Sequence, residues 1–158
     1  MSGSNVRLVT WDPGYARDFD RLNRWWLEKY FTVEPLDEFY LSNPQGTVID
    51  KGGEIFFALD GDVPVGCCAA VPHVNGTLEL AKLGVMPEAH GRGVGRMLCE
   101  SVIAWALAHG YATVFLTSNS TLLSAIGLYE RLGFAHAVMP FPRPYVEADI
   151  YMELPLTR

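Results

Sequence analysis

Three glycines at alternate positions, Gly91, Gly93 and Gly95, stand directly before an apolar pattern that predicts a helix. Residues 78–85 predict a strand before them, and Pro87 ends it because proline has no amide hydrogen to give to a sheet. Glycines at such a junction let a ligand approach the backbone closely, and the first amide groups of the helix form its positive end. The sequence therefore predicts a backbone cradle for an anion such as phosphate.

Two other phosphate loops do not fit this stretch. A Walker A loop ends in Gly-Lys-Ser/Thr, which does not follow here. A dinucleotide fingerprint that starts at Gly91 or Gly93 needs a further glycine or alanine at its last position, where this chain has arginine or leucine. The spacing that fits is Gln/Arg-x-x-Gly-x-Gly/Ala, with His90 in its first position.

Residues 79–98 and 125–134 together resemble the two signature regions of the GNAT superfamily of acyl-CoA-dependent N-acyltransferases, in their order and separation as well. His90 departs from the glutamine or arginine that is usual there. The resemblance implies that acetyl-CoA is the co-substrate, with residues 91–96 around its pyrophosphate and the backbone amide of Val85 on its thioester oxygen. The cofactor-binding residues implied in this way are Leu83, Val85, His90, Gly91, Arg92, Gly93, Val94, Gly95, Arg96, Asn119 and Ser124.

Acyl transfer to an amine requires a base, because a lysine-like ammonium has a pKa near 10.4 and neutralising it at pH 7 costs roughly 4 to 5 kcal/mol. Glu79 lies where one branch of the resembling family carries its general-base glutamate. The two-residue period of a strand predicts that it shares a face with Leu83 and Val85. The alternatives are a solvated glutamate at this position, with Glu54, His73 or a water chain as the base.

Tyr129 matches the tyrosine that protonates the departing thiolate in the resembling family, four residues before Gly133. It also falls on an apolar helical stripe, so a buried phenol with one hydrogen-bond partner is the alternative. Asn119 and Ser124 are expected beside the pantetheine, although Leu122 stands where the family often has an asparagine. We assign Tyr129 as the general acid.

Charge and composition limit the partners. The 158 residues carry a net charge of −6, with 49% hydrophobic and 19% charged residues, which is typical of one soluble globular domain spanning residues 1–158. No basic stripe is available, so we expect no nucleic-acid partner, and Arg92 and Arg96 are placed to help hold phosphates locally. The expected partner is a small-molecule or peptide amine, and a homodimer is compatible with the sequence.

The remaining composition predicts a cytoplasmic protein without a metal. Cys67, Cys68 and Cys99 are an odd number of thiols without ligand spacing, which indicates reduced core residues, and the four histidines have no zinc spacing. Residues 1–10 lack the pattern of a signal peptide, and no apolar run reaches membrane-spanning length. Hydrolase motifs of the Gly-x-Ser-x-Gly and His-Glu-x-x-His types are absent from the sequence.

The first third of the chain predicts a strand, a helix and an irregular segment. Residues 6–9 form the strand, and Asp12 and Pro13 open a helix with an aromatic stripe on its apolar face. Residues 32–53 are irregular around one short helix at 36–41, and such segments often carry specificity. Aromatic residues near the end of the first helix, with one from the C-terminal part, are the predicted substrate-binding residues. They are Trp26, Tyr30, Phe31 and Tyr145.

The rest of the chain predicts a mixed sheet. Asp60-Gly61 and Asn75-Gly76 separate apolar runs and indicate an antiparallel meander. A strand–helix–strand unit then implies a parallel neighbour through a right-handed crossover. The ranges expected are strands at 55–59, 63–71, 78–85 and 114–117, helices at 94–108 and 125–132, and a half-solvated strand at 146–154. The predicted fold class is α/β, a mostly antiparallel sheet with one splayed parallel pair, flanked by helices, as the GNAT resemblance also implies.

These observations predict an acetyl-CoA-dependent N-acetyltransferase that acts on a primary amine by direct attack, with Glu79 as base, directly or through water, and Tyr129 as acid. The alternative from another class is a non-catalytic module that binds acyl-CoA in the same cradle to sense it. That module would be stabilised by the cofactor without transferring an acetyl group.

Overall fold

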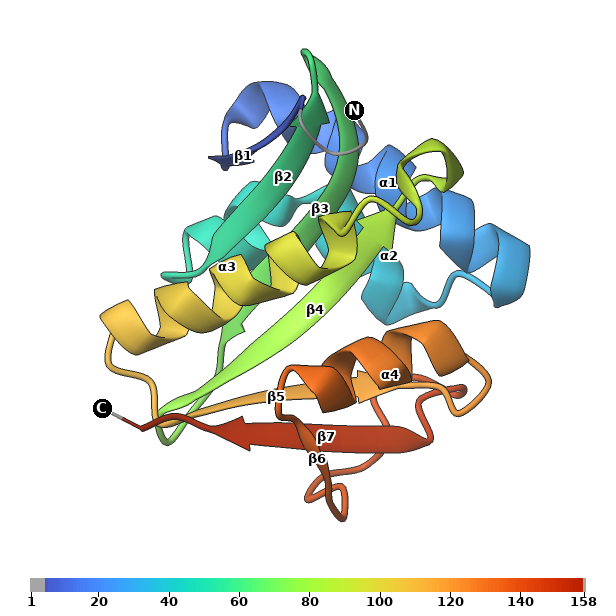
Figure 1. The fold of residues 1–158 in the computed structure, drawn as a ribbon. Coiled ribbons are helices and arrows are strands. Elements are labelled where there is room, and N and C mark those ends of the chain that lie inside the picture. Colours follow the sequence, from blue (N-terminus) through green and yellow to red (C-terminus); the bar gives the residue numbers. More distant parts are fainter. Residues whose placement is uncertain (1–4, 158) are drawn as a thin grey trace.

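A computed structural model describes residues 5–157, in which seven strands form one sheet in the order β1-β2-β3-β4-β5-β7-β6 (Figure 1). The first four strands are an antiparallel meander: β1 (Val6–Thr10), β2 (Glu54–Asp60), β3 (Val63–Pro72) and β4 (Thr77–Val85). The two hairpin turns contain Gly61 and Gly76, whose φ angles are positive, as the Asp-Gly and Asn-Gly pairs predict.

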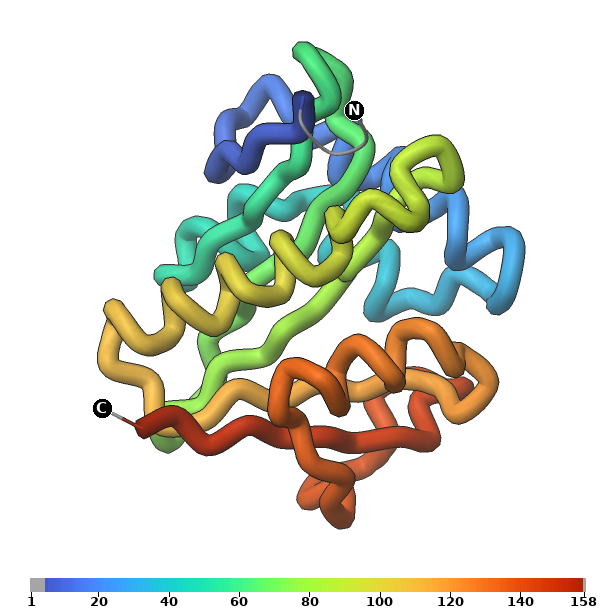
Figure 2. Tube along the Cα trace, viewed as in Figure 1, coloured from blue at the N-terminus to red at the C-terminus, as the bar shows by residue number. Residues whose placement is uncertain are grey.

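The second half of the sheet contains β5 (Thr113–Ser118), β6 (Ala135–His136) and β7 (Ile150–Pro155). β5 runs parallel to β4, and the two strands pair only from Thr77 to Glu79 on β4 in the described part of the chain. Figures 1 and 2 show that they lie together near the start of β4 and diverge toward its end. The predicted splayed parallel pair is thereby confirmed.

Helices cover both faces of the sheet. α1 (Ala16–Tyr30) and α2 (Pro35–Ser42) pack on one face through a core that includes Phe19, Leu22 and Leu41. α3 (Val94–Ala108) and α4 (Leu123–Arg131) pack on the other through a core that includes Leu98, Val102 and Tyr129. Three single-turn elements complete the list: η1 (Pro13–Tyr15), η2 (Gln45–Ile49) and η3 (Pro87–Ala89). All three cysteines are buried and free, as predicted.

A β-bulge in β4 overturns one prediction about the site. Cys67 pairs with Gly84 and Ala69 with Ala81, so Cys68 lies opposite two residues, Lys82 and Leu83. Lys82 takes up the extra residue with a φ of 56°. Side chains therefore change faces at this point. The expected common face of Glu79 with Leu83 and Val85 is wrong, because Leu83 and Val85 pack on the α3 side, whereas Ala81, two residues after Glu79, packs on the α1 side.

The C-terminal strand is shorter than predicted. It begins at Ile150, because Val146 donates its amide to Glu34 and Asp149 accepts hydrogen bonds from Ser120. Val146 is 74% exposed, whereas Tyr151 is buried. None of the helices in residues 5–157 is long and apolar enough to cross a membrane.

Candidate active site

A cavity of about 920 Å³ lies where β4 and β5 separate, and it reaches both faces of the sheet. Every predicted site residue except Arg92 lines it. These are Trp26, Tyr30, Phe31, Glu79, Leu83, Val85, His90, Gly91, Gly93, Val94, Gly95, Arg96, Asn119, Ser124, Tyr129 and Tyr145. The fold therefore brings the two signature regions and the aromatic end of α1 to one space.

The glycine loop has the geometry of an anion cradle. Gly91 and Gly93 have φ angles of 77° and 73°, a conformation that favours glycine, and a Cβ at either would meet no protein atom within 4 Å. No side chain caps α3, so its first amides are free of side-chain acceptors. His90 Nε2 lies 2.8 Å from the carbonyl oxygen of Val85, which ties the loop to the end of β4. Open space beside free amides fits a diphosphate.

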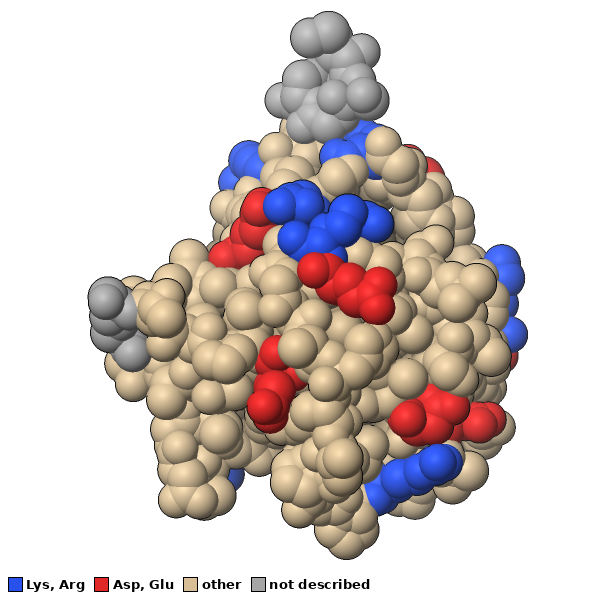
Figure 3. All heavy atoms as spheres, turned by 60° about the horizontal axis from the view of Figure 1, so that its bottom comes forward, with Lys and Arg blue, Asp and Glu red and all other residues tan. Residues whose placement is uncertain are grey.

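The two arginines of the loop, Arg92 and Arg96, pair with different carboxylates, and only Arg96 lines the cavity. Arg92 is not among the residues that line the cavity, and its guanidinium pairs with Asp60 at 2.9 Å, so the expected help from this side chain in holding phosphate stays a prediction. Arg96 lines the cavity with a half-exposed side chain paired to Glu100 at 3.1 Å. Arg131 at the end of α4 also lines the cavity and was missed, because nothing local in its sequence distinguishes it from a surface arginine. On the face shown in Figure 3, Lys and Arg atoms gather in small separate groups.

Asn119 and Ser124 lie at the α4 end of the cavity. The side chain of Asn119 accepts from the amide of Thr121 in its own loop at 2.9 Å and donates to the carbonyl oxygen of Glu147, in the segment before β7, at 2.7 Å. Its polar atoms therefore hold the loop before α4 in place. Ser124 occupies the first turn of α4, whose N-cap Leu122 provides no side-chain hydrogen bond.

Tyr129 is both a core residue and part of the cavity wall. It is 7% exposed and packs against Phe134 in the α3–α4 core, and it also lines the cavity. Burial, followed by the nearby Cys99 and Cys68, raises the pKa of its phenol well above the ordinary value. The hydroxyl is therefore protonated at neutral pH, as a proton donor must be.

Glu79 sits at a junction between two cavities. Its side chain is 15% exposed, and its Oε1 lies 2.9 Å from Nε2 of His73. A second cavity of about 300 Å³ shares Glu79, Thr117 and Tyr145 with the main one. Glu54, an alternative base, lines neither cavity and instead accepts from the backbone amide of Trp11.

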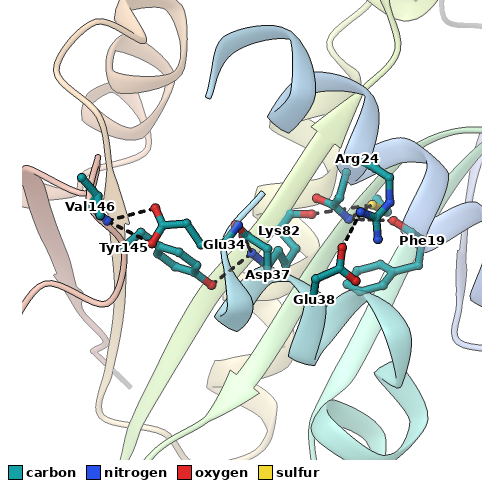
Figure 4. Close-up of polar contacts among 10 residues, drawn as sticks. Phe19, Arg24, Glu34, Asp37, Glu38, Lys82, Tyr145 and Val146 are labelled. Carbon is teal, nitrogen blue, oxygen red and sulfur yellow. Dashed lines mark hydrogen bonds and ion pairs between the residues drawn. The ribbon is translucent and has the colours of Figure 1, made fainter. Parts of the chain in front are cut away.

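An ion pair between Lys82 and Asp37 closes the α2 side of the main cavity and was missed by sequence reasoning. Lys82 Nζ lies 2.5 Å from Asp37 Oδ1 and donates to the hydroxyl of Tyr145 at 3.0 Å (Figure 4). The two charged side chains are 7% and 3% exposed. Burial, followed by the charge of Asp37, raises the pKa of Tyr145, so its hydroxyl stays neutral. The sequence did offer one sign of this buried pair, because Lys82 is a charged residue within the apolar strand β4.

The aromatic end of α1 forms another part of the wall. Trp26 and Phe31 pack edge to face with their ring centroids 6.0 Å apart, and Tyr30 is 55% exposed at the rim. Glu34 follows them and accepts from the amide of Val146 at 3.0 Å, which links α2 to the segment before β7 (Figure 4).

Comparison with known proteins agrees with this geometry. The sequence pattern of the acetyltransferase (GNAT) family matches residues 19–134, which include the cradle, Glu79 and Tyr129. The chain belongs to the GNAT family.

Two curated relatives of this GNAT protein show how much of the chain is shared with known proteins. It is 33% identical to human N-acetylaspartate synthetase over 104 residues, 64% of this chain and 32% of the relative, so the match spans about a third of that protein. It is 28% identical to an uncharacterized N-acetyltransferase of Schizosaccharomyces pombe over 164 residues, which cover 100% of this chain and 99% of the relative.

Solved structures share the GNAT fold at lower identity. An acetyltransferase of the GNAT family from Staphylococcus aureus Mu50 superposes with a TM-score of 0.88 and 17% identity, covering 96% of this chain and 99% of that one. A phosphinothricin acetyltransferase from Sinorhizobium meliloti in complex with acetyl-CoA has a TM-score of 0.78 and 20% identity, covering 96% and 89%. These likenesses establish the fold.

Proposed function

We propose that this GNAT-family protein is an acetyl-CoA-dependent N-acetyltransferase that acetylates a primary amine of a small molecule or peptide. The observation that carries the proposal is one cavity lined by the glycine cradle, Tyr129 and Glu79. A phosphate-binding loop, a proton donor and a proton acceptor thus face the same space. The activity follows from this combination, since none of the three alone distinguishes a transferase from a binding protein.

Acetyl-CoA, when bound, supplies an activated acetyl thioester. The free amides at the start of α3 would hold its diphosphate, with Arg96 and Arg131 nearby, and the space beside Gly91 and Gly93 leaves room for the close approach. The backbone amide of Val85 would polarise the thioester oxygen. Because backbone groups carry these contacts, a side chain would affect them chiefly by filling the space that the diphosphate needs.

Glu79 takes a proton from the acceptor's ammonium group. The neutral nitrogen then forms a bond to the acetyl carbon while the carbon–sulfur bond breaks, and the proton of Tyr129 goes to the departing sulfur. His73, at 2.9 Å from Glu79 and with a side chain that is 39% exposed, passes the abstracted proton to solvent. Proton balance is completed when solvent reprotonates Tyr129 and the new amide loses its second proton.

Two measurements test this proposal. Calorimetric titration with coenzyme A should show binding, and thiol release from acetyl-CoA should require an added amine. The name of one relative denotes N-acetylaspartate, so L-aspartate belongs in the amine panel. Coenzyme A binding without transfer to any amine would instead support a non-catalytic acyl-CoA-binding module, and absence of binding would refute both functions.

A further inference from the structure

The second cavity is an aromatic chamber on the α2 side of the sheet. Its walls include Leu36, Tyr40, Phe115 and Phe141, and it shares Glu79 with the wall of the main cavity. Its volume of about 300 Å³ is at the lower end of ligand pockets and equals about ten water-sized volumes of roughly 30 Å³. The chamber therefore has room for one small apolar group.

The chamber walls are arranged to take a flat apolar group. Phe115 lies 5.7 Å from Phe141 between ring centroids, with the planes inclined by 61°, and Phe115 also stacks on Tyr151 at 5.9 Å. Phe141 is 37% exposed although it belongs to this aromatic cluster. Aromatic side chains at such angles provide edges and faces for another ring.

The charges near Glu79, where the two cavities share a wall, favour an amine and oppose a carboxylate. Lys82 is already neutralised by Asp37, and both side chains are almost fully buried. Glu79 lines both cavities and pairs with His73 of the chamber wall, and two further carboxylates, Glu34 and Glu147, line the main cavity. A ligand that carried its own carboxylate would meet like charge there and would compete with Asp37 for Lys82.

We infer that the acceptor is a primary amine attached to an apolar, ring-sized body without a carboxylate, and that this body occupies the aromatic chamber while the amine lies at Glu79. This inference rests on the proposed function, because it assigns the acceptor side of the same site. It makes the chamber the element that selects the substrate, whereas the cradle selects the cofactor.

The first experiment measures acetylation of three matched compounds. 2-Phenylethylamine has the ring and no carboxylate, L-phenylalanine adds only the carboxylate, and ethylamine removes the ring. The kcat/KM for 2-phenylethylamine should exceed each of the others by about tenfold or more. Equal or better use of L-phenylalanine or ethylamine would overturn the inference while leaving acetyl transfer established.

The second experiment changes the chamber. Phe141→Ala should raise the KM for 2-phenylethylamine roughly five- to tenfold and leave that for ethylamine unchanged. Val138→Ala is the matched control, because Val138 belongs to the same segment, is 91% exposed and lines neither cavity. Equal KM values for the two variants would refute the role of the chamber, and coenzyme A affinity reports whether each variant is folded.

A binding measurement separates the inference from the proposed function. Calorimetry of 2-phenylethylamine with the coenzyme A-loaded protein requires no acetyl transfer. Binding that Phe141→Ala weakens, without acetylation of any amine, would support the chamber and refute the transferase. Acetylation of amines, with binding that Phe141→Ala leaves unchanged, would support the transferase and refute the chamber.

Discussion

Lys82 Nζ and Asp37 Oδ1 lie 2.5 Å apart in a part of the molecule from which water is almost excluded, with side chains 7% and 3% exposed. Removing one partner of a buried ion pair strands the other charge and costs about 3–5 kcal/mol. We therefore expect Lys82→Met to lower the free energy of unfolding by that amount in urea denaturation. The exposed pair of Arg7 and Asp62 provides the control, and Arg7→Met should cost about 1 kcal/mol or less.

The double variant Lys82→Met with Asp37→Asn distinguishes a stranded charge from lost packing. It should recover most of the stability, because the asparagine can still accept from the amide of Glu34, as Asp37 does at 2.9 Å. A double variant as unstable as Lys82→Met would show that the methylene groups of Lys82 matter more than its charge.

Gly95→Val should close the cradle without unfolding the chain. Gly95 lies inside α3, and a Cβ there would approach Leu128 at an ordinary 3.5 Å. The added side chain would instead occupy space that faces the cavity, so the Kd for coenzyme A should rise at least about tenfold. Ala104→Val in the same helix is the control, because Ala104 is exposed and does not line the cavity. Equal affinities of the two variants for coenzyme A would contradict the cradle.

Tyr129→Phe should lower kcat by about 10²- to 10⁴-fold, because the phenol is the proposed donor to the departing sulfur. Coenzyme A affinity should change little, since the ring and its packing on Phe134 remain. Tyr15→Phe removes a hydroxyl far from the chemistry, from a ring that packs on Phe57. A kcat for Tyr129→Phe within twofold of the wild type would leave the tyrosine as a core residue.

Glu79→Gln should lower turnover at pH 7 and recover it at higher pH. For an amine with a pKa near 10.4, the neutral fraction increases about tenfold with each unit by which the pH rises toward that value. The need for a base therefore shrinks as the pH rises. Thiol-release assays at pH 7 and pH 9 measure this change. Glu54→Gln, at the alternative base that lines neither cavity, should show the wild-type pH dependence. A pH-independent defect in Glu79→Gln would argue for a purely structural carboxylate.

Alkaline pH should destabilise the fold through its buried thiols. Burial raises the pKa of Cys67 from 9.0 to about 12, against the weaker effect of a hydrogen bond from Asn23. Above pH 9 the unfolded thiol loses its proton while the folded one keeps it, so the unfolded state binds fewer protons and stability falls as pH rises. Between pH 9 and 12 this thiol contributes a loss of about 1.4 kcal/mol per pH unit. Urea denaturation of Cys67→Ala should show a smaller loss across that window.

Local signals predicted most of the frame. The Asp60-Gly61 and Asn75-Gly76 pairs predicted the two hairpin turns, because each turn needs a residue with positive φ and glycine adopts it readily. The start of α3 directly after Gly93 was predictable in the same way, because Gly93 also has a positive φ. The parallel pairing of β4 and β5 followed from chain length and handedness between them. These features depend on residues close together in the sequence or on general rules of connection.

Long-range contacts explain what sequence reasoning missed. The extra residue at Lys82 reversed the faces of β4, and a strand pattern alone cannot reveal which partner residue lies opposite two others. Arg92 pairs with Asp60, which lies 32 positions away in the sequence, and Lys82 pairs with Asp37, which lies 45 positions away. Val146 left the predicted strand because its amide meets Glu34. Each contact requires the fold to be known first.

The short pairing between β4 and β5 has a wider consequence. From Leu80 on β4 and Leu116 on β5, each strand presents an edge toward the other although both lie in the middle of a sheet. Such edges usually lie at the border of a fold, where they attract unwanted strands. Here they border the cavity, and in the proposed function their peptide groups meet the cofactor, so substitutions that change side chains and keep the strands in place would leave that surface intact.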